Sequence, residues 1–148
     1  MTAGVNDRFD FTAPVPPAAE LGPVHFIAIG GSGMSGVARM FLAAGVRVSG
    51  SDARDSATLR ALEAEGAEVF VGQQESNLAE DVRTVVISSA IREDNPELIA
   101  ARERGLAVLH RAQGIASLLH GRSAVAVAGT NGKTTTSAMM TVALQHCG

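Results

Sequence analysis

The 148-residue sequence contains no tryptophan, no tyrosine and a single cysteine, Cys147. Without Trp and Tyr it has little aromatic surface on which single-stranded nucleic acid could stack. One cysteine cannot form an internal disulfide, and no signal-peptide pattern opens the chain, so we do not expect secretion. No apolar run approaches the roughly 18 residues that a membrane helix needs. We therefore expect a soluble, cytoplasmic protein.

Positive charge is also scarce. The sequence has 12 Lys and Arg against 15 Asp and Glu, which gives a formal net charge of −3. Such a balance offers no general electrostatic surface for nucleic acid or for an acidic membrane, and we expect neither as a partner. A phosphate-containing ligand would have to be held locally, by backbone N–H groups. The sequence does not indicate an oligomeric state.

The arrangement of apolar residues predicts an α/β fold. From residue 24 onward, short apolar runs alternate with helical stretches, which is typical of a Rossmann-like parallel sheet with helices on both faces. Residues 1–21 hold three prolines and no periodicity, and they predict a flexible tail. The predicted strands are 24–29, 46–49, 67–71, 84–88, 107–109 and 124–128, and the predicted helices are 34–44, 56–65, 96–104, 112–120 and a stretch after Gly132.

A first glycine-rich loop lies between the first predicted strand and helix. Gly31-Ser32-Gly33-Met34-Ser35-Gly36 fits the pattern G-x-G-x-x-G, in which the glycines allow a tight turn and a close approach to a pyrophosphate. Asp52 lies 21 residues beyond Gly31, where an acid can accept hydrogen bonds from ribose hydroxyls. The pattern indicates a nucleotide but does not distinguish a dinucleotide from a nucleoside diphosphate sugar. A tight structural turn, with Asp52 simply solvated, is the alternative.

A second glycine-rich loop follows the last predicted strand. It runs through Gly129, Thr130, Asn131, Gly132, Lys133, Thr134 and Thr135 and matches a phosphate-binding P-loop, except that Val127 stands where the general pattern has glycine. The two glycines let the backbone curl around phosphates. Lys133 would reach the β and γ phosphates of ATP as the catalytic residue, and the Thr134 hydroxyl would be a ligand of Mg²⁺. An NAD(P)-binding oxidoreductase, the main alternative, has no use for this loop.

These two loops do not occur alone. Between them lie Ser49-Gly50-Ser51-Asp52, Ser88-Ser89-Ala90-Ile91, Asp94-Asn95-Pro96-Glu97 and His110-Arg111-Ala112. In this order and spacing, from about residue 24 to the last residue, the sequence resembles the Mur ligase family of peptidoglycan synthesis. The resemblance implies a UDP-substrate-binding domain over residues 22–120 and the start of the central ATP-binding domain over 121–148. Gln73 and Asn131 stand where relatives commonly carry histidine.

The resemblance also implies an activity. The member of the family most like this sequence uses ATP and Mg²⁺ to join L-alanine to UDP-N-acetylmuramate through an acyl phosphate, in peptidoglycan synthesis. The UDP diphosphate would lie on the backbone of residues 31–36, and the nucleoside would be bordered by Asp52, Ser88, Ser89 and Ala90. The related tripeptide ligase of cell-wall recycling stays open as an alternative, as does a non-catalytic module that binds a UDP-sugar.

The resemblance places other parts of the reaction farther along the family's sequence. A metal-binding acid and histidine of the central domain, and the third domain that helps to hold the amino acid, have no counterpart among these residues. We therefore expect the chain to be the N-terminal part of a ligase and to be inactive by itself. His25 and His110, each at a predicted strand, are interpreted as structural residues and not as metal ligands.

Overall fold

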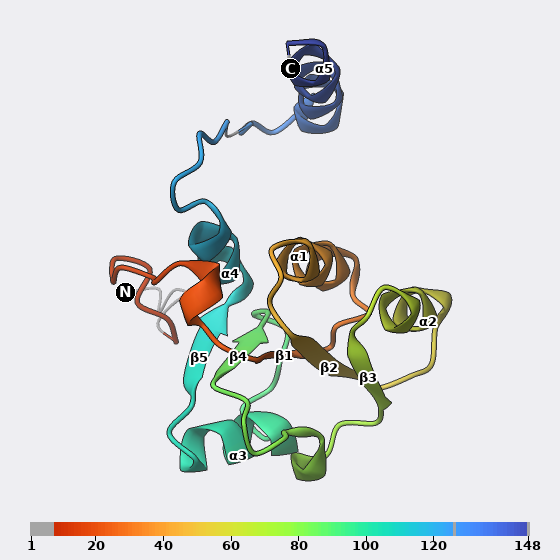
Figure 1. The fold of residues 1–148 in the computed structure, drawn as a ribbon, viewed down its shortest axis with the longest axis vertical. Coiled ribbons are helices and arrows are strands. Elements are labelled where there is room, and N and C mark those ends of the chain that lie inside the picture. The colour runs from red at the N-terminus through yellow and green to blue at the C-terminus, as the bar shows by residue number, and fades with distance from the viewer. Residues whose placement is uncertain (1–7, 126, 148) are drawn as a thin grey trace.

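Five parallel strands form a single sheet in the order β3-β2-β1-β4-β5 (Figure 1). The structure is a computed structural model, and it describes residues 8–125 and 127–147. The predicted Rossmann-like sheet is confirmed, and its central strands β1 and β4 are buried at every position, as strands covered on both faces must be. The strands are Val24–Ile27 (β1), Val48–Asp52 (β2), Glu68–Val71 (β3), Thr84–Ile87 (β4) and Ala107–His110 (β5).

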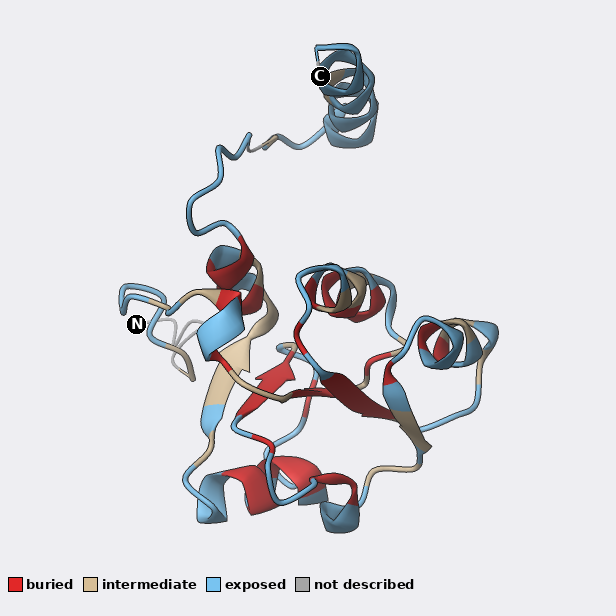
Figure 2. Ribbon diagram, in the orientation of Figure 1, coloured by how far each residue is buried: buried red, intermediate tan, exposed pale blue. Residues whose placement is uncertain are grey.

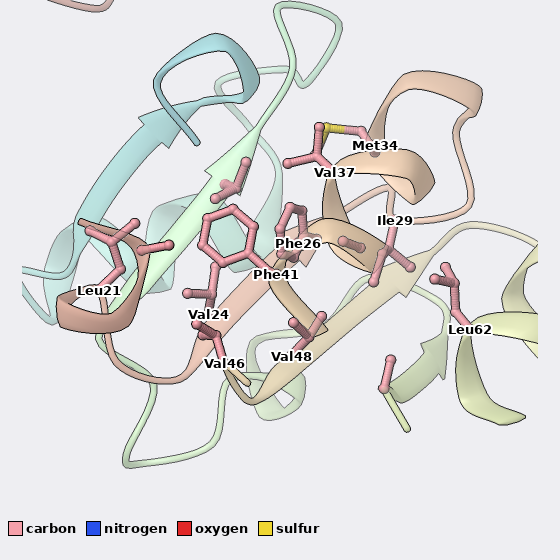
Figure 3. Packing of buried hydrophobic residues seen from close by; sticks show 14 of the residues in the cluster. Leu21, Val24, Phe26, Ile29, Met34, Val37, Phe41, Val46, Val48 and Leu62 are labelled. Carbon is pink, nitrogen blue, oxygen red and sulfur yellow. The ribbon is translucent and has the colours of Figure 1, made fainter. Parts of the chain in front are cut away.

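Helices cover both faces of the sheet (Figure 1). On one face, Ser32–Ala43 (α1), Ala57–Ala64 (α2) and Arg111–Leu118 (α4) contribute to one hydrophobic cluster, which also includes Phe26 of β1. The ring of Phe26 meets that of Phe41 edge to face, with 5.6 Å between the ring centroids (Figure 3). On the other face, Pro96–Glu103 (α3) packs a second apolar cluster against β1 and β4. The strands β1, β2 and β4 and the inner sides of these helices are the buried parts of the molecule, whereas the edge strands β3 and β5 are partly exposed (Figure 2).

Short-range capping fixes where the helices begin. The Asn95 side chain accepts hydrogen bonds from the N–H groups of Glu97 (3.0 Å) and Leu98 (3.1 Å), which confirms the predicted start of α3. Ser56 accepts from Leu59 N–H at the start of α2. His110 caps α4 with its Nδ1 atom, which accepts from the N–H of Ala112 (3.1 Å). The last strand is therefore joined to α4 with no intervening loop.

Residues 8–21 pack against the sheet domain, where the sequence led us to expect a flexible tail. Residues 18–20 form a short 3-10 helix (η1), and Ala18 and Leu21 are buried in the cluster that includes α1. Phe9 packs against the cluster on the opposite face. The prediction is thus corrected over 8–21, because a few apolar side chains of this segment pack against the two hydrophobic clusters of the domain. Residues 1–7 lie outside the described residues.

The strand predicted over residues 124–128 is also corrected. Among the described residues between 121 and 132, none belongs to a strand, and the helix Lys133–His146 (α5) has no buried residue. No hydrogen bond or ion pair of residues 8–125 and 127–147 connects 123–147 to the sheet. A β-strand needs a neighbouring strand to satisfy its backbone groups, and the described residues of this segment pair with no strand of the sheet. Ala126 lies outside the described residues.

No helix in the described part of the chain is long and apolar enough to cross a bilayer.

A buried polar cluster connects the strands to α3. The carboxylate of Glu97 is fully buried and accepts hydrogen bonds from Ser51 Oγ (2.5 Å) and Asn77 Nδ2 (2.6 Å). His25 Nε2 lies 3.6 Å from the same carboxylate, and His25 Nδ1 is 2.9 Å from Ser49 Oγ. Burial by itself raises the pKa of Glu97, but the nearby His25 ring and the hydrogen bonds from Ser51 and Asn77 together hold it below its ordinary value of 4.5.

Replacing this carboxylate by an amide tests the cluster. We expect Glu97→Gln to lower the free energy of unfolding at pH 7 by about 2 kcal/mol, because an amide turns one of two acceptor oxygens into a donor facing donors. Since the folded pKa lies below the unfolded value of 4.5, the carboxylate stabilises fully above that value and less as the pH falls through the folded pKa. The difference between the two proteins should therefore shrink in acid, which urea unfolding at pH 7, 5 and 3.5 measures.

The matched control is Glu63→Gln, which alters an exposed carboxylate on α2 and should leave stability nearly unchanged at every pH. A destabilisation by Glu97→Gln that stays constant from pH 7 to 3.5 would show that the carboxylate's ionisation does not contribute.

The exposure of α5 leads to a second prediction. An isolated 14-residue helix is marginal in water, so we expect its amides to show protection factors on the order of 10 or less in hydrogen exchange. The amides of β1 and β4, which are buried on both faces, should exchange more slowly by several orders of magnitude. Uniformly slow exchange over 133–146 would contradict this expectation and would mean that α5 packs against something.

Candidate functional site

The strand order reverses between β1 and β4, and the candidate site lies at this reversal. β1 pairs with β2 on one side and with β4 on the other, with Phe26 opposite Val86. The chain therefore leaves the ends of β1 and β4 as adjacent loops that turn in different directions. Such a switch point opens a crevice at the carboxyl edge of a parallel sheet, where ligands of α/β proteins bind.

The loop after β1 presents two unused backbone donors. Gly31 is the N-cap of α1, and its carbonyl accepts from the N–H groups of Met34 (3.0 Å) and Ser35 (2.9 Å). The N–H groups of Ser32 and Gly33 have no such partner among the described residues. They lie in the first turn of a 12-residue helix, where the helix dipole favours an anion.

These hydrogen bonds leave only some of residues 31–36, the predicted phosphate-binding loop, with free N–H groups. The side chains of Met34 and Ser35 are buried and their N–H groups are used within the helix, so they position the loop. Gly36 has open space around the position of a Cβ atom. The free donors are thus those of Ser32 and Gly33.

The backbone of this loop is held under strain. Ala28 has a φ of 62°, a left-handed conformation that costs a non-glycine residue about 1 kcal/mol or more. Its carbonyl accepts from the N–H of Gly31 (3.2 Å) and closes the turn. Next to it, Ile29 packs directly onto β2 at Gly50, where a Cβ atom would lie 2.6 Å from Ile29 Cδ1. Close packing on β2 holds the turn in this conformation.

Asp52, at the end of β2, lies against the glycine loop. Its Oδ2 atom accepts a hydrogen bond from the N–H of Gly30 at 3.0 Å. The acid predicted to contact a ribose therefore lies against the glycine-rich turn and stabilises it by this hydrogen bond.

The loop after β4 carries Ser88, Ser89 and Ala90 to the same edge. Ser88 is half-buried, whereas Ser89 and Ala90 are exposed. Ser89 Oγ lies 3.1 Å from Nε2 of His110. Because His110 Nδ1 accepts the N–H of Ala112, the proton of the neutral ring belongs on Nε2, which donates to Ser89. Burial, and then the charges of Arg111 and Arg8, lower the pKa of His110, which favours this neutral form.

Arg111 lies at the candidate site, although the sequence did not single it out. A Cβ atom built on Gly33 would overlap Arg111 Nη1, so the guanidinium lies directly against the glycine loop. It brings a positive charge next to the two free N–H groups. His110-Arg111-Ala112 belonged to the recognised pattern, but only the folded position of α4 shows which loop Arg111 reaches.

A pocket of about 320 Å³ lies at the same edge, between the loops that follow β3 and β4. Gln73 and Asn95 border it, and Asn95 Nδ2 donates to Gln73 Oε1 (2.7 Å). Ala90, at the end of the predicted nucleoside-binding loop, borders it as well. Asn95 Oδ1 is already used in capping α3, so the Gln73 amide is the main uncharged polar group for a ligand. Arg92 and Asp94, which pair with each other, also line the pocket.

The second glycine loop has the geometry of a helix start but no contact with the first. Gly129 (φ 152°) and Gly132 (φ 76°) both adopt conformations that side chains disfavour, and Gly132 is the N-cap of α5. Lys133 and Thr134 begin α5, and residues 128–136 are all exposed. The structure therefore does not bring the two loops together into one site.

Metal ligands are few. Within the described residues, no group of three or more His, Cys, Asp and Glu side chains is arranged to hold a metal ion. The Thr134 hydroxyl, exposed in the first turn of α5, offers one oxygen ligand.

Known proteins resemble the chain over this whole domain. Residues 23–123 match the family described as Mur ligase family, catalytic domain. A UDP-N-acetylmuramate–L-alanine ligase of Thermobifida fusca is 60% identical over 129 residues, which are 87% of this chain and 27% of that protein. The enzyme of the same name from Saccharopolyspora erythraea is 55% identical, over 84% of this chain and 26% of its own length. The chain thus spans about a quarter of the length of these relatives.

Solved structures agree with these matches. A UDP-N-acetylmuramate-alanine ligase from Thermotoga maritima superposes with a TM-score of 0.76 at 34% identity, over 84% of this chain and 29% of that one. A UDP-N-acetylmuramate:L-alanyl-γ-D-glutamyl-meso-diaminopimelate ligase from Neisseria superposes with a TM-score of 0.77 at 33% identity, over 86% and 40%. Since the family match covers residues 23–123 of 148, the chain belongs to the Mur ligase family.

Proposed function

We propose that this chain supplies the UDP-N-acetylmuramate-binding part of an ATP-dependent ligase that joins L-alanine to that substrate in peptidoglycan synthesis, in the cytoplasm. The observation that carries the proposal is the 60% identity to a relative that bears this name, over 87% of the chain. The geometry supports it independently, because a diphosphate needs closely spaced donors and a positive charge, and Ser32, Gly33 and Arg111 supply them at the switch point.

In this proposal the nucleotide follows the carboxyl edge of the sheet. The N–H groups of Ser32 and Gly33, with Arg111, bind the diphosphate, and Asp52 braces the turn beneath it and accepts from the ribose. The uracil ring occupies the pocket bordered by Gln73 and Asn95, where the Gln73 amide is the polar group that meets the edge of the ring. Ser88, Ser89 and Ala90 border the nucleoside.

We assign ATP to the second glycine loop. The positive φ of Gly129 and Gly132 curls the backbone as a phosphate cradle requires, and the residues of the first turn of α5, where the helix dipole favours an anion, are exposed. Lys133 lies in the first turn, where it can reach the β and γ phosphates, and Thr134 would contribute one oxygen to Mg²⁺. That ion would neutralise phosphate charge while the carboxylate of the substrate is phosphorylated.

The tripeptide ligase is the second candidate, because its fold fits this chain as well as that of the alanine ligase. Murein peptide ligases superpose with TM-scores of 0.77 and 0.79, against 0.76 for the alanine ligase. The curated relatives decide between them in our proposal, since those at 51–60% identity bear the name of the L-alanine ligase. Both candidates bind UDP-N-acetylmuramate through this domain.

Thermal unfolding with three ligands tests the assignment. At about a hundredfold excess over its dissociation constant, UDP-N-acetylmuramate should stabilise the chain by about 2.7 kcal/mol, which shifts Tm on the order of 10 °C. NADH at matched concentration should give no shift. A shift with NADH and none with the UDP-sugar would refute the proposal in favour of an oxidoreductase domain, and a shift with Mg-ATP would measure the competence of the second loop.

Removing the charge of Arg111 tests the diphosphate site. We expect Arg111→Met to weaken binding of UDP-N-acetylmuramate by about tenfold to a hundredfold, because a charge-assisted hydrogen bond contributes about 1.5–3 kcal/mol. Isothermal titration calorimetry measures the change. Arg47→Met is the matched control, since Arg47 immediately precedes β2 at the opposite edge of the sheet and its side chain is 65% exposed. Equal affinities of both variants would remove Arg111 from the site.

A further inference from the structure

The segment of residues 8–13 is fixed to the carboxyl edge of the sheet. The rings of Phe9 and Phe11 contact the imidazole of His110, with centroid distances of 5.1 and 5.3 Å. The side-chain amide of Gln113 donates to the carbonyl of Asp10 (3.1 Å). The segment is thus held on the residue that caps α4, immediately before the arginine that reaches the glycine loop.

Arg8, at the start of this segment, is a guanidinium with a donor to spare. Its side chain is only 24% exposed, and Nη1 donates to the carbonyl of Ile91 (2.7 Å). Nε forms an ion pair with Glu93, and the guanidinium lies 5.7 Å from the ring centroid of Phe9. Nε and Nη2 are both buried, and neither makes a hydrogen bond with a described residue. A buried donor of a charged group is costly to leave unpaired, so its position points to a partner that binds there.

The local charges leave Arg8 free to attract an anion. Glu93 contacts both Arg8 and Arg102, so one carboxylate faces two guanidiniums and one positive charge remains in excess. The neighbouring Arg92 and Asp94 pair with each other at 2.9 Å and cancel. The excess charge lies beside a pocket.

That pocket has a volume of about 530 Å³ and lies between Arg8 and the loop after β4. Ser89 and Ala90, which border the nucleoside in the proposed function, are among its lining residues. Ser89 is hydrogen-bonded to His110, and the imidazole of His110 also contacts the rings of Phe9 and Phe11. Arg8 of the N-terminal segment and two residues of the proposed nucleotide site therefore line the same pocket.

We propose that Arg8 is a further ligand-binding residue, whose Nη2 donates to an anionic group of the UDP-sugar. That group is either a phosphate or the carboxylate of the sugar, and the Phe9 and Phe11 rings on His110 hold Arg8 in place for it. The proposal depends on the proposed function for its ligand. It differs from a purely structural role of the segment, in which Arg8 serves only to bind Ile91 and Glu93.

Titration of the Arg8→Met variant with three ligands separates these roles. UDP-N-acetylmuramate carries both anions, UDP-N-acetylglucosamine lacks the carboxylate, and uridine lacks both. We expect the variant to bind UDP-N-acetylmuramate about tenfold more weakly while its affinity for uridine, followed by NMR shifts, stays within about twofold of the unchanged chain, because one charge-assisted hydrogen bond is lost. A loss for both UDP-sugars identifies the phosphate as the partner of Arg8, and a loss for the muramate alone identifies the carboxylate.

Three further variants guard against misfolding and general charge effects. Arg8→Lys should retain part of the affinity, because it keeps the charge. The double variant Phe9→Ala/Phe11→Ala should reproduce the loss, because it releases Arg8 from His110. Arg47→Met should bind as the unchanged chain does. An Arg8→Met variant that binds all three ligands normally, or that loses uridine as strongly as the UDP-sugars, overturns the inference. Failure of the unchanged chain to bind any UDP-sugar overturns the proposed function with it.

Discussion

The pairing of β1 between β2 and β4 is the constraint on which the rest of the structure depends. Parallel strands need crossover connections. The chain therefore runs from β1 outward through β2 and β3 and then crosses back over the sheet to place β4 on the other side of β1. The glycine loop and the loop of Ser88–Ala90 therefore end up adjacent although more than fifty residues separate them in the sequence. The contacts proposed for the anionic groups of the ligand, including those of Arg111 and Arg8, lie around this reversal of the strand order.

The rigidity of that edge comes from interactions that lie beneath it. Glu97, at the start of α3, collects hydrogen bonds from β2 and from the turn before β4, and it faces His25 of β1. A buried charge of this kind is costly unless each oxygen has a partner, so the cluster tolerates little displacement of the strands that bear it. It also explains the polar residues in β1 and β2, which are otherwise unusual in the centre of a parallel sheet. The strained turn at Ala28 is maintained by the packing of the neighbouring Ile29 on Gly50.

What the sequence could predict was governed by local chemistry. The strand-to-helix rhythm, the cap at Asn95 and the turn of Gly31–Gly36 each depend on neighbouring residues, and each is recognisable in the sequence. The strand at 124–128 was predicted from a short apolar run before the second glycine loop, but a strand exists only beside a partner, and the described residues of this run pair with none. The positions of Arg111 and of residues 8–13 depend on how distant segments pack, and no local pattern encodes that. Arg8 in particular lies in a stretch whose prolines and lack of periodicity suggested a tail.

The two glycine loops share one mechanism but differ in preorganisation. The first is braced by Asp52, covered by Arg111 and continuous with a buried helix, so its two free N–H groups are fixed before a ligand arrives. The second opens a helix without a buried residue, and a phosphate bound there would have to order that helix as it binds. Ordering costs free energy, which lowers the affinity of the second loop relative to the first for the same number of donors. A nucleotide diphosphate offered to this chain should therefore prefer the loop after β1, even though the loop at Lys133 carries the more recognisable sequence motif.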